Sequence, residues 1–341
     1  MPEPKPSRAV AAVLALVAPP GVAHAYLGMP LRGVVWLAAR LLLAIGAMAL
    51  GPSLGLGPWG VVGAIVVPWL AMIGDIAFVP SRRFGKTSGG AIGGVLAAGV
   101  VASLGLSVAI RILVIEAFKI PAGSMAPTLL VGDHIFVDKL AYRGRAPRYG
   151  EVMVFAFPEH PEQEFVKRVI GLPGDRLQFE GGRPRINGWE VPHCKVGTWS
   201  YEDPDSTALH HTGELDVEFL GDQAYLVFFD EASGAYPDSQ GPYRAKPDEY
   251  WVLGDNRNNS HDSRMWFGGT GGGVPRRLVR GPAMFVWISV GFDGVTHDRY
   301  GVPVHGTTLP PGAESLQPAL DACLRSRPPP SATTPPRATG S

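Results

Sequence analysis

Residues 91–133 read AIGGVLAAGVVASLGLSVAIRILVIEAFKIPAGSMAPTLLVGD, and this stretch divides the chain into two unlike parts. From position 91 to position 115 it is apolar apart from Arg111 and a few small residues. That length is enough for a helix to cross a bilayer, which takes about 20 residues. Beyond Lys119, glycine, proline and aspartate interrupt short apolar runs. The sequence therefore predicts a membrane helix that leads directly into a water-soluble part.

The distribution of charge supports the same division. Among 341 residues, 18% are charged and 46% are hydrophobic, and the 30 basic residues balance the 30 acidic ones. Charge is sparse between positions 10 and 110, where it is carried by Arg32, Arg40, Asp75, Arg82, Arg83 and Lys86. A net charge of zero gives no general attraction to nucleic acid, so we expect no nucleic-acid partner.

Two further apolar stretches precede the first, and we expect transmembrane helices at about 33–50, 58–79 and 91–115 within a membrane part that covers 33–117. The N-terminal segment, residues 1–32, contains a shorter apolar run at 9–18, which Pro19-Pro20-Gly21 ends. It is predicted to form a partial helix or, with distortion, a fourth span. Residues 1–25 also have the form of a cleavable signal peptide, but the prolines and the spans that follow favour its retention.

Basic residues set the expected orientation of these spans. Arg82, Arg83 and Lys86 lie in the short loop before the last span, which places that loop in the cytoplasm. The chain after the last span is then extracytoplasmic. Arg40 and Asp75 lie inside spans, where a polar contact between helices or snorkelling to the interface explains them better than a transport path.

From residue 118 onward the pattern is that of an all-β domain. Short apolar runs separated by turn residues predict strands at 133–138, 151–157, 165–170, 225–229, 250–253 and 283–289. We expect an extracytoplasmic β domain over 118–305, with an inserted β-rich subdomain at about 180–247. The Pro-, Ser- and Thr-rich tail, 306–341, is predicted to be disordered.

Neither the cysteines nor the histidines indicate a metal site. Cys194 and Cys323 are too few and too far apart for a zinc ribbon, and whether they form a disulfide stays open. The nine histidines show no ligand spacing. We therefore expect no metal and no cofactor.

A hydrolase without a metal needs a nucleophile, a base and donors for the oxyanion. The chain has no G-x-S-x-G and no S-x-x-K motif, which leaves a serine–lysine pair as a candidate. Lysine acts as a base only when burial lowers its pKa toward neutrality. Lys167 lies in the apolar run Phe165-Val-Lys-Arg-Val-Ile170, although a lysine in a strand is more often an exposed residue.

Three blocks in order strengthen this candidate: IPAGSMAPTLLVGD at 120–133, KRVIGLPGD at 167–175 and GDNRNNSHDSR at 254–264. Together they resemble type I signal peptidase, the bacterial leader peptidase of the Ser/Lys-dyad serine protease family, from about residue 118 to 301. The resemblance implies that Ser124 is the nucleophile and Lys167 the general base. It further implies supporting residues: Ser260 to orient the lysine, Asp262 and Arg264 in an ion-pair network, and Asp255, Arg257 and Arg168 as scaffold.

One position departs from the resemblance. Many bacterial members have a serine two residues before the nucleophile, whose hydroxyl donates to the oxyanion, and this chain has Ala122 there. The oxyanion hole would then depend on the backbone N–H of Ser124 and a further donor. We expect apolar side chains beside the pair to form the substrate pocket, and packing in the core is an equal alternative for them. These residues are Ile120, Pro121, Met125, Phe165 and Val166.

The implied function is that of a membrane-bound serine endopeptidase that cleaves signal peptides from exported preproteins through an acyl-enzyme. It would be a multi-pass protein of the bacterial inner membrane with its catalytic domain on the periplasmic side. Its expected partners are preproteins bearing signal peptides, membrane lipid and, as an open alternative, the secretion machinery. Other readings remain: a specialised member with one secretion or conjugation substrate, an inactive β scaffold, and a self-cleaving repressor-type protease, against which the spans argue.

Overall fold

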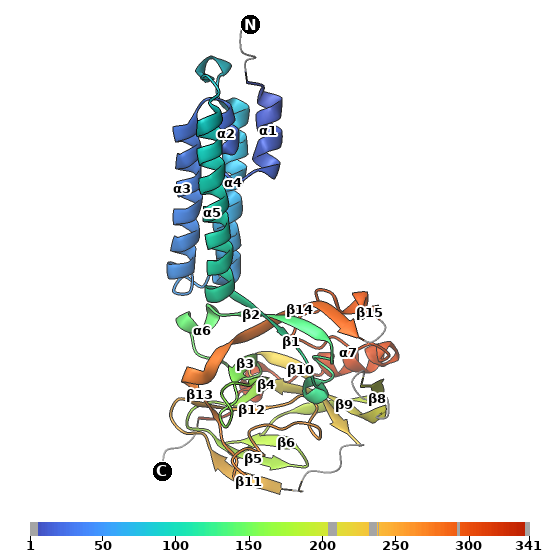
Figure 1. Ribbon diagram of the computed structural model, residues 1–341. Coiled ribbons are helices and arrows are strands. Elements are labelled where there is room, and N and C mark those ends of the chain that lie inside the picture. The colour runs from blue at the N-terminus through green and yellow to red at the C-terminus, as the bar shows by residue number, and fades with distance from the viewer. Residues whose placement is uncertain (1–5, 204–209, 232–236, 238, 292–293, 338–341) are drawn as a thin grey trace. The chain divides into compact units, whose positions relative to one another are not determined.

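Helices form the N-terminal part of the computed structural model, which describes residues 6–203, 210–231, 237, 239–291 and 294–337 (Figure 1). The chain separates into two units, Met1–Glu116 with Lys139–Gly144, and Ala117–Asp138 with Arg145–Ser341. The helices of the first unit are α1 (Arg8–Val17), α2 (Val22–Tyr26), α3 (Pro30–Leu50), α4 (Gly57–Phe78), η1 (Ser81–Arg83), α5 (Gly89–Leu113) and α6 (Ala141–Gly144).

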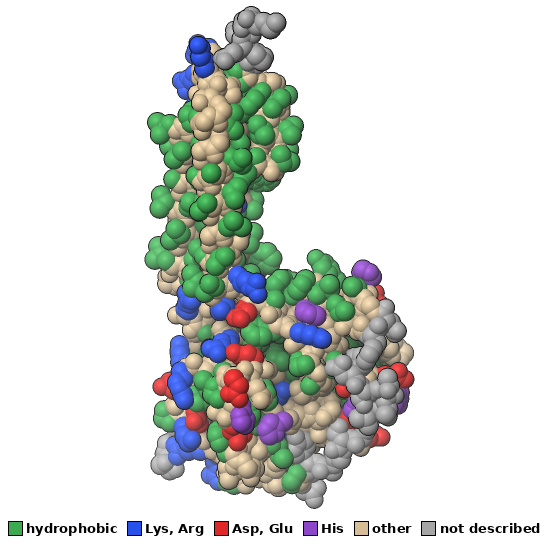
Figure 2. Space-filling model, viewed as in Figure 1, with side chains coloured by type: hydrophobic (Ala, Val, Ile, Leu, Met, Phe, Trp, Pro, Cys, Tyr) green, Lys and Arg blue, Asp and Glu red, His purple; other side chains and the backbone are tan. Residues whose placement is uncertain are grey.

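Helices α3, α4 and α5 are long and apolar enough to cross a membrane, at 21, 22 and 25 residues. Many large hydrophobic side chains of these helices are exposed, and they are spread over the face seen in Figure 2. Pro30 starts α3 in the first turn, where its missing N–H costs nothing, and the Ser88 hydroxyl caps α5 by accepting from the N–H of Ala91. The three long apolar helices predicted from the sequence are confirmed, and the short apolar run forms the ten-residue helix α1.

Asp75 of α4 is the centre of a polar contact between helices. Its carboxylate accepts hydrogen bonds from Trp36 Nε1 (3.0 Å) and Arg32 Nε (2.7 Å) of α3. His24 Nε2 of α2 lies 2.9 Å from the same carboxylate. The charge at Asp75 therefore ties helices together, since a carboxylate that is largely withdrawn from water is stable when its oxygens are hydrogen-bonded.

An eight-stranded sheet forms the main part of the second unit. Its order is β1-β2-β14-β3-β4-β12-β13, with β15 paired to β14. Met153 of β3 lies opposite Lys167 of β4, which fixes the register of the lysine. These strands are β1 (Ile115–Lys119), β2 (Asp133–Asp138), β3 (Val152–Ala156), β4 (Glu164–Gly171), β12 (Glu249–Leu253), β13 (Val274–Pro275), β14 (Val279–Gly291) and β15 (Gly294–Val295).

Two smaller sheets lie within residues 176–244 and complete the β-rich fold expected for this part. A four-stranded sheet has the order β11-β5-β6-β7, and a three-stranded sheet has the order β10-β9-β8. Their strands are β5 (Arg176–Glu180), β6 (Arg183–Ile186), β7 (Trp189–Glu190), β8 (His193–Glu202), β9 (His210–Leu220), β10 (Gln223–Asp230) and β11 (Ser239–Arg244). Short 3-10 turns are η2 (Gly123–Met125), η3 (Arg276–Leu278), η4 (His297–Arg299) and η5 (Glu314–Leu316).

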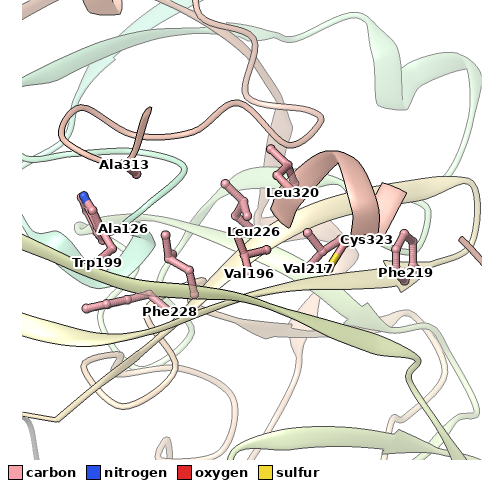
Figure 3. Packing of buried hydrophobic residues seen from close by; sticks show 11 residues of the cluster. Ala126, Val196, Trp199, Val217, Phe219, Leu226, Phe228, Ala313, Leu320 and Cys323 are labelled. Atoms are coloured by element: carbon pink, nitrogen blue, oxygen red, sulfur yellow. The ribbon is translucent and has the colours of Figure 1, made fainter. Parts of the chain in front are cut away.

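The tail differs from its prediction of disorder. It forms α7 (Gln317–Arg325) and α8 (Pro330–Thr333), and Cys323 forms a disulfide with Cys194 of β8. Figure 3 shows Leu320 and Cys323 of α7 beside Val217 and Leu226 of the three-stranded sheet. The prediction is therefore wrong for α7, because apolar residues spaced four apart and one covalent link outweigh the Pro-rich composition around them. Residues 338–341 lie outside the described part.

Removing the disulfide is expected to destabilise the second unit. The bond closes a loop with a sequence separation of 129 residues, so the chain-entropy model gives a loss of about 4–5 kcal/mol for Cys323→Ser. Denaturant unfolding of the full chain in detergent, followed by tryptophan fluorescence, measures this loss. The double variant Cys194→Ser/Cys323→Ser should match the single one, and equal midpoints for variant and oxidised wild type would contradict the prediction.

Candidate active site

Ser124 lies in the 3-10 turn η2, five residues after the end of β1. The turn is held from within, because the side chains of Ile120 and Met125 are buried in the core of the large sheet. Ser124 itself is half-buried, and Ala122 is exposed. The serine hydroxyl is therefore presented at the surface of a rigid core, as a nucleophile requires.

Lys167 brings its amine to this hydroxyl from the middle of β4. Its Nζ donates to Ser124 Oγ (2.7 Å) and to the carbonyl oxygen of Val166 (3.1 Å). Only 4% of the lysine is exposed. Burial lowers the pKa of the amine from 10.5 to about 8, although the Asp262 and Asp255 carboxylates oppose this by raising it. A neutral amine at hydrogen-bond distance from a serine hydroxyl can take its proton.

The polar block after β12 packs against the dyad. Asp262 and Arg264 form a buried ion pair (2.8 Å). Burial raises the pKa of Asp262, but the Arg264 guanidinium, the N–H of Gly254 and the Ser260 hydroxyl outweigh it and bring the pKa below its usual range. The predicted ion pair is present, and Ser260 lies against its carboxylate. The direct bond expected from Ser260 to Lys167 stays a prediction.

Arg168, the residue after Lys167, forms a second buried ion pair with Asp255. Arg168 Nε and Nη2 donate to the two carboxylate oxygens (2.7 and 2.6 Å), and the Thr128 hydroxyl donates to Asp255 (2.5 Å). This contact joins the strand of the lysine to the loop of the serine. Arg257, the third expected scaffold residue, pairs with buried Glu218 of β9 (2.5 Å).

Gly254 lies between the turn that carries Ser124 and the loop that carries Ser260. A Cβ at this position would lie 2.3 Å from the Ser124 carbonyl oxygen and 2.3 Å from Ser260 Oγ. Atoms cannot approach so closely without moving their neighbours. The absence of a side chain at Gly254 therefore sets the distance between the turn of Ser124 and Ser260.

The five expected pocket residues lie in three kinds of environment: the core, its edge and the exposed surface. Ile120 and Met125 have their side chains in the core, so the packing role that the sequence left open is confirmed for both. Phe165 stacks on Phe157 (ring centroids 4.5 Å apart), and Val166 packs against the core from its edge. Pro121 is exposed. Substrate contact stays a prediction for all five.

Sequence reasoning missed several residues that hold the site, namely Thr128, Gly254, Glu218, Asn256 and Tyr201. Asn256 and Gly254 lie inside the third block, where the density of short polar residues was a usable signal. Tyr201 comes from β8, which none of the three blocks includes. Its place depends on the pairing of distant strands, which the local pattern does not encode.

Comparison with known proteins agrees with this geometry. The family model described as signal peptidase, peptidase S26, matches residues 94–288, which is more than half of the chain. A signal peptidase I of Pseudomonas aeruginosa is 35% identical over 206 residues, which cover 53% of this chain and 67% of that protein. One from Leptolyngbya laminosa is 35% identical over 190 residues, with 53% and 73% covered. With the Ser–Lys pair inside the matched region, the chain belongs to the signal peptidase family, peptidase S26.

Proposed function

We propose that the chain cleaves preproteins with Ser124 as the nucleophile and Lys167 as the general base. As a member of the signal peptidase family it is a serine peptidase that removes signal peptides from secreted preproteins. The observation that supports the residue assignment is the 2.7 Å contact between Ser124 Oγ and the buried Lys167 amine. Buried cations without a carboxylate in direct contact are rare unless they act chemically.

The reaction follows from that contact. The neutral amine of Lys167 takes the hydroxyl proton as Ser124 Oγ attacks the scissile carbonyl, and it returns the proton to the leaving amine. Water, deprotonated by the same lysine, then attacks the acyl-enzyme and frees the serine. The two buried ion pairs, Arg168–Asp255 and Asp262–Arg264, keep the strand and the loops in place throughout.

Ala122 leaves the oxyanion with fewer side-chain donors than the family pattern has. We expect Ala122→Ser to leave turnover unchanged or to raise it, because an added hydroxyl donor near the oxyanion stabilises the transition state. Ala122 is exposed, so the substitution meets no packing barrier. Steady-state cleavage of a signal-peptide substrate measures kcat, with Ala122→Gly as the control for changed shape. A severe loss of kcat in Ala122→Ser would mean that a hydroxyl at position 122 does not fit this oxyanion hole.

The pH profile should show the lowered pKa of the base. Because the reactive form is the neutral amine, kcat/KM is expected to rise about tenfold per pH unit below pH 8 and to level off above it. The measurement uses a peptide substrate without groups that titrate between about pH 6 and 10. A rise centred near the ordinary lysine value of 10.5 would show that burial does not lower the pKa of Lys167.

We further place the catalytic unit on the periplasmic side of a bacterial inner membrane. The basic loop at Arg82, Arg83 and Lys86 precedes α5, which favours a cytoplasmic position for that loop. Ser124 follows Leu113, the last residue of α5, by eleven residues, so the chain keeps the nucleophile within about 40 Å of the end of the helix. Such tethering raises the effective concentration of membrane-borne substrates.

Protease accessibility tests this orientation. Protease added to spheroplasts that contain the full chain should digest the second unit, whereas inverted membrane vesicles should protect it. The opposite pattern would refute the proposed topology.

Cleavage of a model preprotein by the purified full chain in detergent tests the function. The expected product ends after a small residue, as the mass of the released signal peptide would show. Cleavage of one narrow substrate class would indicate a specialised member of the family, and an inactive wild type would indicate a scaffold.

A further inference from the structure

Asn256 holds the nucleophile turn from outside the dyad. This residue is fully buried, and its backbone N–H donates to the carbonyl oxygen of Ser124 (3.2 Å). Its side-chain Nδ2 donates to the carbonyl oxygen of Gly123 (3.2 Å). Asn256 also bridges to Phe228 of β10. The two carbonyls that flank the amide of Ser124 are thus bound to one residue.

Tyr201 of β8 is the second member of this support. Asn256 Nδ2 also donates to the Tyr201 hydroxyl (3.3 Å). A Cβ at Gly123 would lie 2.8 Å from the same hydroxyl oxygen. The phenol oxygen therefore touches the residue that precedes the nucleophile, at a position where only glycine leaves room for it.

The ring of Tyr201 is fixed by its neighbours. It stacks on Trp199 (centroids 4.7 Å apart, planes at 14°) and on His211 (4.7 Å, 15°). Trp199 Nε1 in turn donates to the carbonyl oxygen of Pro311, and His211 Nδ1 lies 2.7 Å from buried Asp230. Burial and the nearby Asp230 and Asp203 carboxylates raise the pKa of Tyr201, so its hydroxyl stays protonated. Stacked rings of this kind cannot shift without breaking several contacts.

We propose that Tyr201 is a positioning residue for the reaction: through Asn256 and Gly123, its hydroxyl holds the Ser124 turn in register with Lys167. The proposal rests on Ser124 being the nucleophile. It assigns a role in catalysis to the three-stranded sheet, which lies outside the three blocks that carry the family resemblance. A displacement of about 1 Å at a reacting group can cost about 10²-fold in rate, so a modest loss of support should be measurable.

Tyr201→Phe tests the hydroxyl while it keeps the ring and its stacking. We expect kcat to fall about tenfold, with KM, the unfolding midpoint and the position of the pH profile unchanged, because geometry alone is altered. Tyr243→Phe is the control: the Tyr243 ring also packs against a tryptophan, Trp251 (centroids 4.7 Å apart, planes at 32°), but it lies in the four-stranded sheet. Its kcat should equal that of wild type.

A second pair of variants uses the contact with Gly123. Gly123→Ala should lower kcat by about 10²-fold, because its methyl group meets the Tyr201 oxygen and displaces the turn. Adding Tyr201→Phe removes that oxygen, so the double variant should be more active than Gly123→Ala alone. Tyr201→Phe would thus lower kcat in the wild-type background and raise it in the Gly123→Ala background. Two independent substitutions would instead lower kcat additively.

Two results would overturn the inference: wild-type kcat in Tyr201→Phe, or a double variant no more active than Gly123→Ala. Failure of the proposed function is a different result. Cleavage that survives Ser124→Ala would refute the nucleophile assignment, whatever Tyr201→Phe does. Loss of activity in Ser124→Ala together with wild-type kcat in Tyr201→Phe would refute only the positioning role.

Discussion

Ser124→Ala and Lys167→Met are each expected to lower kcat by at least about 10⁴-fold, the scale seen when a nucleophile or its base is removed from a serine protease. The two residues act as a unit, since Lys167 Nζ is 2.7 Å from Ser124 Oγ. The double variant should therefore be no less active than either single one. Cleavage of a signal-peptide substrate by the full chain in detergent measures all three.

Measurements of the unfolding midpoint distinguish a loss of kcat from misfolding of the variant. Lys167 is a buried amine whose pKa burial lowers, so replacing it by methionine of similar length should not lower the unfolding midpoint. Lys246→Met is the matched control, because the side chain of Lys246 is 76% exposed and it lies in a loop. It should keep wild-type kcat. Cleavage that survives Ser124→Ala or Lys167→Met would refute the dyad.

The membrane part was predictable from the sequence because length and apolarity alone decide it. The three apolar helices of the structure begin and end within three residues of the predicted limits. No contact between distant residues is needed for that prediction, since a helix satisfies its own backbone hydrogen bonds. The contacts of Asp75 are different: the sequence indicated a polar partner, and only the packed helices show Arg32, Trp36 and His24 around it.

Within the second unit, the sequence predicted that Ser124 and Lys167 form a pair, but it did not predict the residues that hold them. Ser124 and Lys167 were predicted from three ordered blocks of sequence. Tyr201 lies beside Gly123 because β8, β9 and β10 pair into one sheet, and no block of sequence indicates that pairing. The tail was misread for a related reason. Its composition indicated disorder, but Leu320 and Cys323 become buried against that same sheet. Strand pairing and a long-range disulfide are non-local, and a local pattern does not encode them.

Gly254→Ala is expected to have the second-largest effect, a fall in kcat of about 10²–10³-fold. The new methyl group would meet the Ser124 carbonyl oxygen and Ser260 Oγ, each at 2.3 Å. The Ser124 carbonyl cannot withdraw easily, because it accepts from the N–H of Asn256. Residue 254 cannot withdraw easily either, because its own N–H is bound to Asp262 (3.1 Å). The nucleophile turn must therefore shift, and a shift of about 1 Å costs about 10²-fold in rate.

Gly291→Ala separates this steric effect from a general cost of replacing glycine. Gly291 ends β14, and a Cβ there meets nothing within 4 Å. The kcat and the unfolding midpoint of Gly291→Ala should match those of wild type. Gly254→Ala should also lose about 1–3 kcal/mol of stability, as overpacking does, but the fully folded variant should still show the loss in kcat. A kcat within a few-fold of wild type would mean that the loop relaxes without moving Ser124, and that the glycine does not set the geometry of the dyad.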